Sequence, residues 1–261
     1  MSLQLLQTMT ATDYQLQKET IDIWQFSMLN QPENAMSLLN KEEQIRARRF
    51  HFPRHQRRFT VARAMMRTIL AQYLHEKPEH LDFSYNKQGK PMIAHHSLIE
   101  FNLAHSGELA LLAVGQTWPM GVDLEFFSAR PYEDIGKHLF SATELTDLSR
   151  QAHDIKPLVF FQIWSQKEAF IKACGLGLSY PTEQFTVPIL SSDEVEIYDS
   201  LHQEYRKMIS FMPEIACSAA LCYNPAVTRL RKITVKPEQI LKVNAGHETF
   251  KPPATTNNKL S

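Results

Sequence analysis

Gly121-Val122-Asp123-Leu124-Glu125-Phe126 is the stretch that decides how this chain is interpreted. Apolar residues alternate in it with Asp123 and Glu125, and this period of two predicts a β-strand with both carboxylates on one face. Two carboxylates side by side on a strand favour the binding of a cation. A solvated polar face is the alternative that the motif leaves open when it is taken alone.

A second stretch, Trp164 to Lys172, reads WSQKEAFIK and predicts a helix. Trp164, Glu168 and Lys172 recur every four residues, so they share one stripe of that helix. An ordinary exposed helix is the alternative, but the aromatic residues just before the stretch argue against it. Magnesium is held in proteins by few carboxylates together with substrate oxygens. Three carboxylates and a lysine therefore indicate phosphoryl chemistry.

Composition limits the partners of the protein. The chain has 261 residues, is 43% hydrophobic and carries 28 basic and 28 acidic side chains. It can bury a core as one domain or two, and its net charge of zero creates no global attraction to nucleic acid or to an anionic membrane. A phosphate-binding surface must then be local, and residues 41–67 supply one with Arg46, Arg48, Arg49, Arg54, Arg57, Arg58 and Arg63. RNA binding is the alternative for this cluster, but exposed aromatic residues for base stacking are not interleaved with it.

The three cysteines and the hydropathy pattern indicate the compartment. Cys174, Cys217 and Cys222 are odd in number and lack metal-ligand spacing, so we expect free thiols in a reducing cytoplasm. No stretch approaches the roughly 20 apolar residues of a membrane helix, and the N-terminus lacks the features of a secretory leader. We therefore expect a cytoplasmic protein with no membrane association.

The chain mixes helix and strand patterns throughout, which predicts an α/β (α+β) fold. Helices are expected at 37–50, 54–75, 141–150 and 156–174, and strands at 21–28, 81–85, 101–105, 109–114, 121–126, 185–187, 195–198, 215–222 and 232–235. We predict an N-terminal half, 1–118, a C-terminal half, 119–243, and a disordered tail, 244–261, rich in Thr, Asn and Pro.

A weak internal repeat supports two similar halves. Phe59, Arg63 and Arg67 have the same spacing as the stripe of Trp164. Two pseudo-symmetric halves would place the active site in the cleft between them, since pockets often lie at domain interfaces.

Several motifs, taken in order, resemble those of the 4′-phosphopantetheinyl transferase superfamily, in its longer, surfactin-synthetase-activating (Sfp) type. The resemblance spans about residues 20–190. The motifs that carry it are Arg48-Arg49-Phe50 with Arg58 eight residues on, Gly89-Lys90-Pro91, Phe101-Asn102-Leu103-Ala104-His105-Ser106, Gly121 to Glu125, Phe140-Ser141 and Trp164 to Leu178.

The resemblance implies a monomer of two pseudo-symmetric α/β halves with coenzyme A in the cleft between them. It implies transfer of 4′-phosphopantetheine to a serine of an apo acyl or peptidyl carrier protein, with release of 3′,5′-ADP. Magnesium would be bound by Asp123, Glu125 and Glu168. Coenzyme A would be bound by Arg58, Lys90, Pro91, His105, Ser106 and Lys172. Glu168 would be the general base, directly or through a water, and Lys172 would neutralise charge on the pyrophosphate.

Some positions depart from the family pattern. Ala104 stands where relatives often have serine, and Leu176 stands where they often have a lysine or arginine between two glycines. Lysines that some relatives place before the Arg-Arg-Phe run fall on or near Glu42 and Ile45. A hydroxyl and peripheral phosphate contacts are therefore not expected here.

Two other classes of function remain open at this point. One is a different magnesium-dependent phosphotransferase or phosphodiesterase acting on nucleotides. The other is a non-catalytic module that binds coenzyme A or RNA. For Trp164 we expect simple packing that holds the Glu168 stripe in place.

Overall fold

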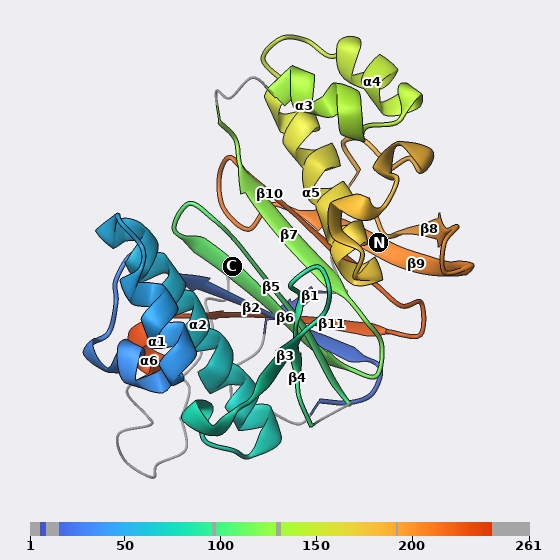
Figure 1. The fold of residues 1–261 in the computed structure, drawn as a ribbon. Coiled ribbons are helices and arrows are strands. Elements are labelled where there is room, and N and C mark those ends of the chain that lie inside the picture. Colours follow the sequence, from blue (N-terminus) through green and yellow to red (C-terminus); the bar gives the residue numbers. More distant parts are fainter. Residues whose placement is uncertain (1–5, 9–15, 96–97, 129–131, 192, 242–261) are drawn as a thin grey trace, which may run out of the picture.

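The computed structural model describes residues 6–8, 16–95, 98–128, 132–191 and 193–241. The predicted tail, 244–261, lies outside them. Figure 1 shows two sheets, each covered by helices on its outer face. The first sheet has the order β1 (Leu6–Thr8), β11 (Arg229–Val235), β2 (Thr20–Ser27), β6 (Leu109–Gln116), β5 (Ile99–Ser106). The second has the order β7 (Gly121–Phe126), β10 (Cys217–Tyr223), β9 (Glu204–Phe211), β8 (Val195–Asp199). A separate hairpin pairs β3 (Phe83–Tyr85) with β4 (Pro91–Ile93).

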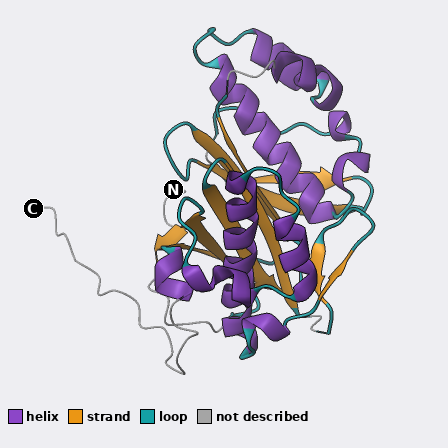
Figure 2. Cartoon of the chain, turned by 60° about the vertical axis from the view of Figure 1, so that its left-hand side comes forward, coloured by secondary structure: helices purple, strands orange, loops and turns teal. Residues whose placement is uncertain are grey.

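Two long helices dominate the outer layers, as Figure 2 shows from a second side. The helices are α1 (Lys41–Arg48), α2 (Pro53–Leu74), α3 (Tyr132–Leu139), α4 (Ala142–Ser149), α5 (Lys156–Cys174) and α6 (Pro237–Leu241). Both long helices have proline in the first turn and end at a residue with left-handed backbone, His75 for α2 and Gly175 for α5. The capping box predicted at Ser141 is present and starts α4.

Alternation along the strands divides the core into three clusters. In β2, Ile23 faces the second sheet whereas Trp24 faces α2, and in β6 Leu111 and Leu112 divide in the same way. A third cluster lies between the second sheet and α5. The layers are therefore helix, sheet, sheet, helix, and they confirm the predicted α/β class with its two α/β halves.

Two sequence predictions of local structure were wrong. The helix expected from Ser37 begins at Lys41, because Asn40 forms a capping box with Glu43 and residues 33–38 form a 3-10 helix. Residues 185–187 form no strand, since the carbonyl of Phe185 accepts a hydrogen bond from the buried ammonium of Lys167 and its ring packs on Phe170.

Strand β9 and helix α3 were missed altogether. In β9 the buried Arg206 interrupts the apolar alternation that would have indicated a strand.

The C-terminal strand differs from the predicted division at residue 118. Strand β11 inserts between β1 and β2 of the first sheet, parallel to both, and α6 packs on α2. The predicted C-terminal half, 119–243, is therefore not one continuous unit, because its last strand and helix complete the N-terminal half.

Candidate active site

The acidic strand lies beneath α5. Val122 and Leu124 are buried between the two sheets, so the period of two turns Asp123 and Glu125 toward the opposite face, where α5 crosses β7. Gly121 permits this crossing: a Cβ at this position would lie 2.0 Å from the carbonyl oxygen of Ala169 and 2.5 Å from the backbone nitrogen of Ala173. The glycine therefore brings the helix, with Glu168 and Lys172, close to the two strand carboxylates.

Asp123 is the most buried of the acids, with 5% of its surface exposed. Its Oδ1 accepts a hydrogen bond of 2.5 Å from the ammonium of Lys172, whereas its Oδ2 is buried without a hydrogen-bond partner among the described residues. The solvated polar face that the sequence left open as an alternative is therefore not present at Asp123. Burial raises the pKa of Asp123 to about 7; Lys172 opposes the rise, and the charges of Glu168 and Glu125 add to it.

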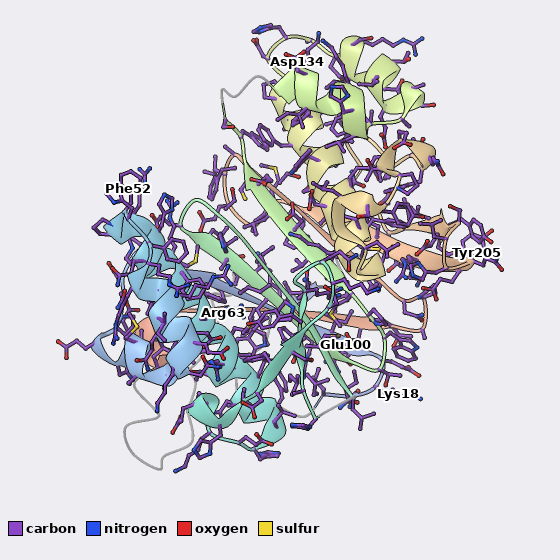
Figure 3. The ribbon with its side chains drawn as sticks, in the orientation of Figure 1. Lys18, Phe52, Arg63, Glu100, Asp134 and Tyr205 are labelled. Atoms are coloured by element: carbon purple, nitrogen blue, oxygen red, sulfur yellow. The ribbon has the colours of Figure 1, made fainter. Side chains whose placement is uncertain are left out.

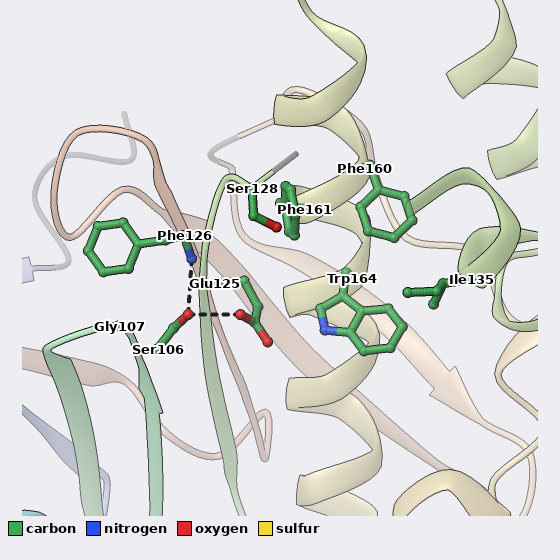
Figure 4. A pocket seen from close by; sticks show the side chains of 9 residues that line it. All are labelled: Ser106, Gly107, Glu125, Phe126, Ser128, Ile135, Phe160, Phe161 and Trp164. Atoms are coloured by element: carbon green, nitrogen blue, oxygen red, sulfur yellow. Dashed lines mark hydrogen bonds between the residues drawn. The ribbon is translucent and has the colours of Figure 1, made fainter. Parts of the chain in front are cut away.

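Glu125 is held from the first sheet. The hydroxyl of Ser106, at the end of β5, donates to Glu125 Oε2 at 2.8 Å and accepts from the backbone N–H of Phe126 at 3.2 Å, as Figure 4 shows. Asn102 Oδ1 likewise accepts from the N–H of Val122 at 2.8 Å. Two side chains of β5 therefore join it to β7, and the sequence had indicated neither bond.

The two charged residues of α5 complete the acidic and basic cluster. Burial raises the pKa of Glu168, against the effect of Lys172 and with the help of Glu125. Burial lowers the pKa of Lys172, but the adjacent Asp123, together with Glu168 and Glu125, outweighs it and the net pKa is raised. Lys172 is therefore charged at neutral pH, and Glu168 holds a proton more readily than an exposed glutamate does.

A basic pocket of about 450 Å³ opens on the α2 side of β5. His105 faces it, because the odd-numbered residues of β5 point toward α2 while Ala104 and Ser106 point toward β7. Loss of hydration in the pocket lowers the pKa of His105, as do the charges of Lys172 and Arg58. Aromatic and basic side chains contribute to the walls: Arg46, Phe50, His55, Arg58, Phe59 and Arg63. The expectation that no exposed aromatic residues are interleaved with the arginines was therefore wrong, because Phe50 and Phe52 are exposed among them.

Two details of this pocket were not predicted. Glu108, in the β5–β6 turn, accepts from Arg58 at 2.8 Å and from Arg57 at 2.7 Å, so a carboxylate orients the predicted phosphate-binding arginine. Arg46 and Arg63, the latter labelled in Figure 3, lie 5.2 and 5.8 Å from the ring centroid of Phe59. Their spacing on α1 and α2 gave no separate signal within the arginine-rich segment.

A middle pocket of about 330 Å³ leads from the basic pocket toward the acids. Pro91 and Leu103 belong to the walls of both pockets, while Lys90, Glu168 and Lys172 line only the middle one. The ammonium of Lys90 donates to the carbonyls of Met120 and Lys172 at 2.9 and 2.8 Å. Burial lowers the pKa of Lys90, with Glu100 opposing the shift.

A third pocket, of about 220 Å³, lies on the other side of Glu125. Figure 4 shows Ser106 and Glu125 at one wall and the aromatic rings of Phe160, Phe161 and Trp164 opposite. Trp164 stacks on Phe160 with ring centroids 6.2 Å apart. The expectation of simple packing for Trp164 was therefore incomplete, since the half-buried ring also lines a pocket.

The departures from the family pattern have structural counterparts. Ala104 is buried in the apolar cluster between the sheets, and Leu176 packs against the cluster under α5. Glu43, beside the positions where relatives carry lysine, is buried and paired with Arg67 at 2.6 Å. Arg67 is fully buried, so it does not match the half-exposed Lys172 that the internal repeat pairs with it.

A second polar cluster lies at the end of α5. Cys174, Asp199 and His202 could together hold a metal ion, but Asp199 also accepts from Arg206 at 2.9 Å and from Tyr180 at 3.0 Å. The guanidinium of Arg206 already supplies a positive partner for the Asp199 carboxylate. All three cysteines are free, and Cys217 and Cys222 are buried as expected.

The basic pocket and the middle pocket share walls and together form a groove that leads to the acids. The fold and this groove define a class: two α/β halves, each a sheet covered by helices, in which an acidic cluster adjoins a basic pocket. Comparison with known proteins assigns the class to a family. Residues 23–117 match the family described as "4′-phosphopantetheinyl transferase, N-terminal", and residues 119–218 match the "4′-phosphopantetheinyl transferase superfamily".

Individual relatives agree with this assignment. The chain is 32% identical to the 4′-phosphopantetheinyl transferase HetI of Nostoc sp. over 79% of this chain and 88% of the relative. It is 32% identical to the 4′-phosphopantetheinyl transferase Sfp of Bacillus subtilis over 65% and 75%. It is 29% identical to the L-aminoadipate-semialdehyde dehydrogenase-phosphopantetheinyl transferase of Mus musculus over 63% and 58%.

The chain belongs to the 4′-phosphopantetheinyl transferase superfamily and is a transferase of the Sfp type. Among its described residues, no helix is long and apolar enough to cross a membrane.

Proposed function

We propose that the protein transfers 4′-phosphopantetheine from coenzyme A to a serine of an apo acyl or peptidyl carrier protein, with Mg²⁺, and releases 3′,5′-ADP. The observation that carries this proposal is the groove itself. Its basic end at Arg58 and His105 is joined through the middle pocket to Glu168 and Lys172. Lys172 in turn pairs with Asp123. A molecule with a phosphorylated nucleotide at one end and a pyrophosphate further along matches that order of charges.

The basic pocket suits the nucleotide of coenzyme A. Arg58, oriented by Glu108, and the neighbouring Arg46 and Arg63 would bind the 3′-phosphate by charge-assisted hydrogen bonds. The rings of Phe50 and Phe59 offer faces on which a purine can stack. His105, whose ring is influenced by the charges of both Lys172 and Arg58, would contact the pyrophosphate.

The three acids fit a magnesium ion. Within the described part of the chain, the buried Asp123 Oδ2 has no hydrogen-bond partner, which suits an atom that binds a metal ion. Glu125 and Glu168 supply two more hard oxygen donors. Bound there, Mg²⁺ would draw charge from the pyrophosphate oxygens. Ser106 would keep Glu125 oriented toward the ion.

The transfer is a displacement at the phosphorus that carries pantetheine. Glu168 would take the proton of the carrier serine, whose oxygen then forms a bond to that phosphorus. The bond from this phosphorus to the bridging oxygen breaks, and the electron pair leaves with 3′,5′-ADP. Lys172 would balance the negative charge that develops on the departing phosphate.

The aromatic pocket beside Glu125 suits the remainder of the donor. Phe160, Phe161 and Trp164 form an apolar wall on the far side of the acids from the nucleotide pocket. We propose that the pantetheine arm extends toward this wall while the carrier serine approaches the acids.

Mass spectrometry tests the proposed function. The protein is incubated with coenzyme A, Mg²⁺ and apo carriers of fatty-acid, polyketide and peptide synthesis, and each carrier is weighed. A gain of one phosphopantetheine that chelation of the metal abolishes is expected. Cleavage of coenzyme A without carrier labelling would favour a different nucleotide phosphotransferase, and binding without any reaction would favour a non-catalytic module.

We also propose that the protein acts as a cytoplasmic monomer. Light scattering of the purified protein and fractionation of cells test the two parts of this expectation separately.

A further inference from the structure

The C-terminal end of α5 is held by the turn of the β3–β4 hairpin. The last carbonyls of a helix have no partner within it. Here one of them, and the carbonyl of the C-cap residue Gly175, are bound by side chains from the other half of the chain. Lys90 Nζ donates to the carbonyl of Lys172 at 2.8 Å, and Asn86 Nδ2 donates to the carbonyl of Gly175 at 2.9 Å. A cation at this end is also favoured by the helix dipole.

The same ammonium reaches the acidic strand. Lys90 Nζ donates to the carbonyl of Met120 at 2.9 Å, immediately before Gly121 at the start of β7. One side chain of the hairpin therefore ties the end of α5 to the beginning of the strand that carries Asp123 and Glu125.

The turn that presents these donors is closed by its own hydrogen bonds. Asn86 Oδ1 accepts from the N–H groups of Gln88 and Lys90 at 3.0 and 2.8 Å. The N–H of Asn86 in turn donates to the carbonyl of Lys90 at 3.0 Å. Gly89 closes the loop with a φ of 82°, which favours glycine. Asn86 thus stabilises the turn through its Oδ1 and binds the end of α5 through its Nδ2.

We propose that Asn86 and Lys90 form a clasp that positions α5 on β7, and that the Lys90 ammonium serves this clasp and does not bind a phosphate of coenzyme A. Two of its three protons are committed to main-chain carbonyls, so contact with a phosphate through them would release both α5 and β7. Lys90 and Asn86 are positioning residues in this account, acting through Glu168 and Lys172. The inference rests on the proposed function for its catalytic consequence.

Kinetics of three variants test the clasp. Lys90→Met and Asn86→Ala should each lower kcat by about tenfold or more, because small displacements of catalytic groups are costly, while KM for coenzyme A changes less than about threefold. Lys87→Met is the matched control, since it removes an exposed ammonium from the same turn, and it should keep both constants. The preference for coenzyme A over 3′-dephospho-coenzyme A should be unchanged in every variant.

Other kinetic outcomes would overturn the clasp. A rise in KM for coenzyme A with kcat retained in Lys90→Met would make Lys90 a substrate ligand. Wild-type kinetics in both clasp variants would show that the contacts position nothing.

Amide hydrogen exchange tests the clasp without the reaction. Exchange in residues 170–174 at the end of α5 should speed up in Lys90→Met and Asn86→Ala and not in Lys87→Met. Unchanged exchange would reject the clasp even if the enzyme is active. Faster exchange in a protein that labels no carrier would retain the clasp and reject the proposed function.

Discussion

At the scale of single residues, the cluster around Asp123 combines burial with unbalanced charge. Three carboxylates face one ammonium, and one oxygen of Asp123 is buried without a partner among the described residues. Such an arrangement is unfavourable unless a cation completes it, because a buried charge needs a partner. We therefore expect the cluster to bind a cation, with an affinity that depends on pH.

Magnesium affinity should rise with pH up to about 7. The pKa of Asp123 is raised to about 7, so below that value the ion must displace a proton, and affinity should increase about tenfold per pH unit before it levels off. Calorimetric titration with Mg²⁺ at pH 6, 7 and 8 measures this. In Asp123→Asn the pH dependence should be weaker, with Glu168 as the remaining ligand whose pKa is raised. Equal affinities of the wild type at pH 6 and 8 would contradict the prediction.

The same shift sets the sign of the stability change in the metal-free protein. The folded-state pKa of Asp123 lies above the ordinary value of 3.8. The contribution of this shift to the free energy of unfolding is therefore fully present below pH 3.8 and is lost as the pH rises toward 7.

Glu168→Gln should lower kcat more than it weakens coenzyme A binding. The change keeps the shape of the side chain but removes the base, and loss of a general base costs on the order of 10²–10⁴-fold. The raised pKa of Glu168, caused first by burial, suits proton transfer near neutral pH. Rates against pH at saturating Mg²⁺ measure the effect. If added Mg²⁺ fully restored kcat of Glu168→Gln, Glu168 would be a metal ligand and not the general base.

At the scale of secondary-structure elements, the crossing of α5 over β7 sets the geometry of the site. The strand offers its carboxylates at a period of two, the helix offers its charges every four residues, and the glycine at 121 lets their backbones approach. Strand β5 adds Ser106 and Asn102 from the other sheet. Each element supplies a part of the site that has no function alone.

Gly121→Ala should displace α5 and reduce kcat strongly. A methyl group would overlap the helix backbone, and overpacking of this kind costs about 1–3 kcal/mol or more. Thermal melting and kcat measure the two effects, and coenzyme A binding through the basic pocket should persist. Gly115→Ala is the control, because the closest contact of the added Cβ is the end of the Met120 side chain and not helix backbone. Equal effects of the two substitutions would argue against the crossing as the cause.

At the scale of the whole molecule, the chain returns to the first sheet near its C-terminal end. Strand β11 completes the first sheet after the chain has built the second one. Its buried Leu230, Ile233 and Val235, with Ile240 and Leu241 of α6, contribute to the core. The N-terminal half therefore depends on residues that follow the second sheet in the sequence.

A chain that ends at residue 228 should fail to fold cooperatively. Burial of the five apolar side chains it lacks is worth on the order of 10 kcal/mol, comparable to the whole stability of a typical domain. Circular dichroism during thermal unfolding measures the loss. The matched control ends at residue 241 and keeps every described element, so it should melt cooperatively. A cooperative transition in the shorter chain would contradict the prediction.

The sequence by itself determined the elements that carry the chemistry. Periods of two and four placed Asp123 with Glu125 on a strand and Glu168 with Lys172 on a helix, because side-chain direction follows from local backbone geometry. The capping box at Ser141 and the end of α5 at Cys174 were local signals of the same kind. The family was also evident, since its motifs are short and ordered along the chain.

Only the tertiary structure decided which groups meet. The burial of Asp123, the bond from Ser106 to Glu125, the orientation of Arg58 by Glu108 and the use of Lys90 at the end of α5 all join segments distant in sequence. Strand β11 shows the same limit, since its pattern indicated a strand but not the sheet to which it belongs. Local patterns fix the direction of a side chain relative to its own backbone, whereas its partners depend on how the elements pack.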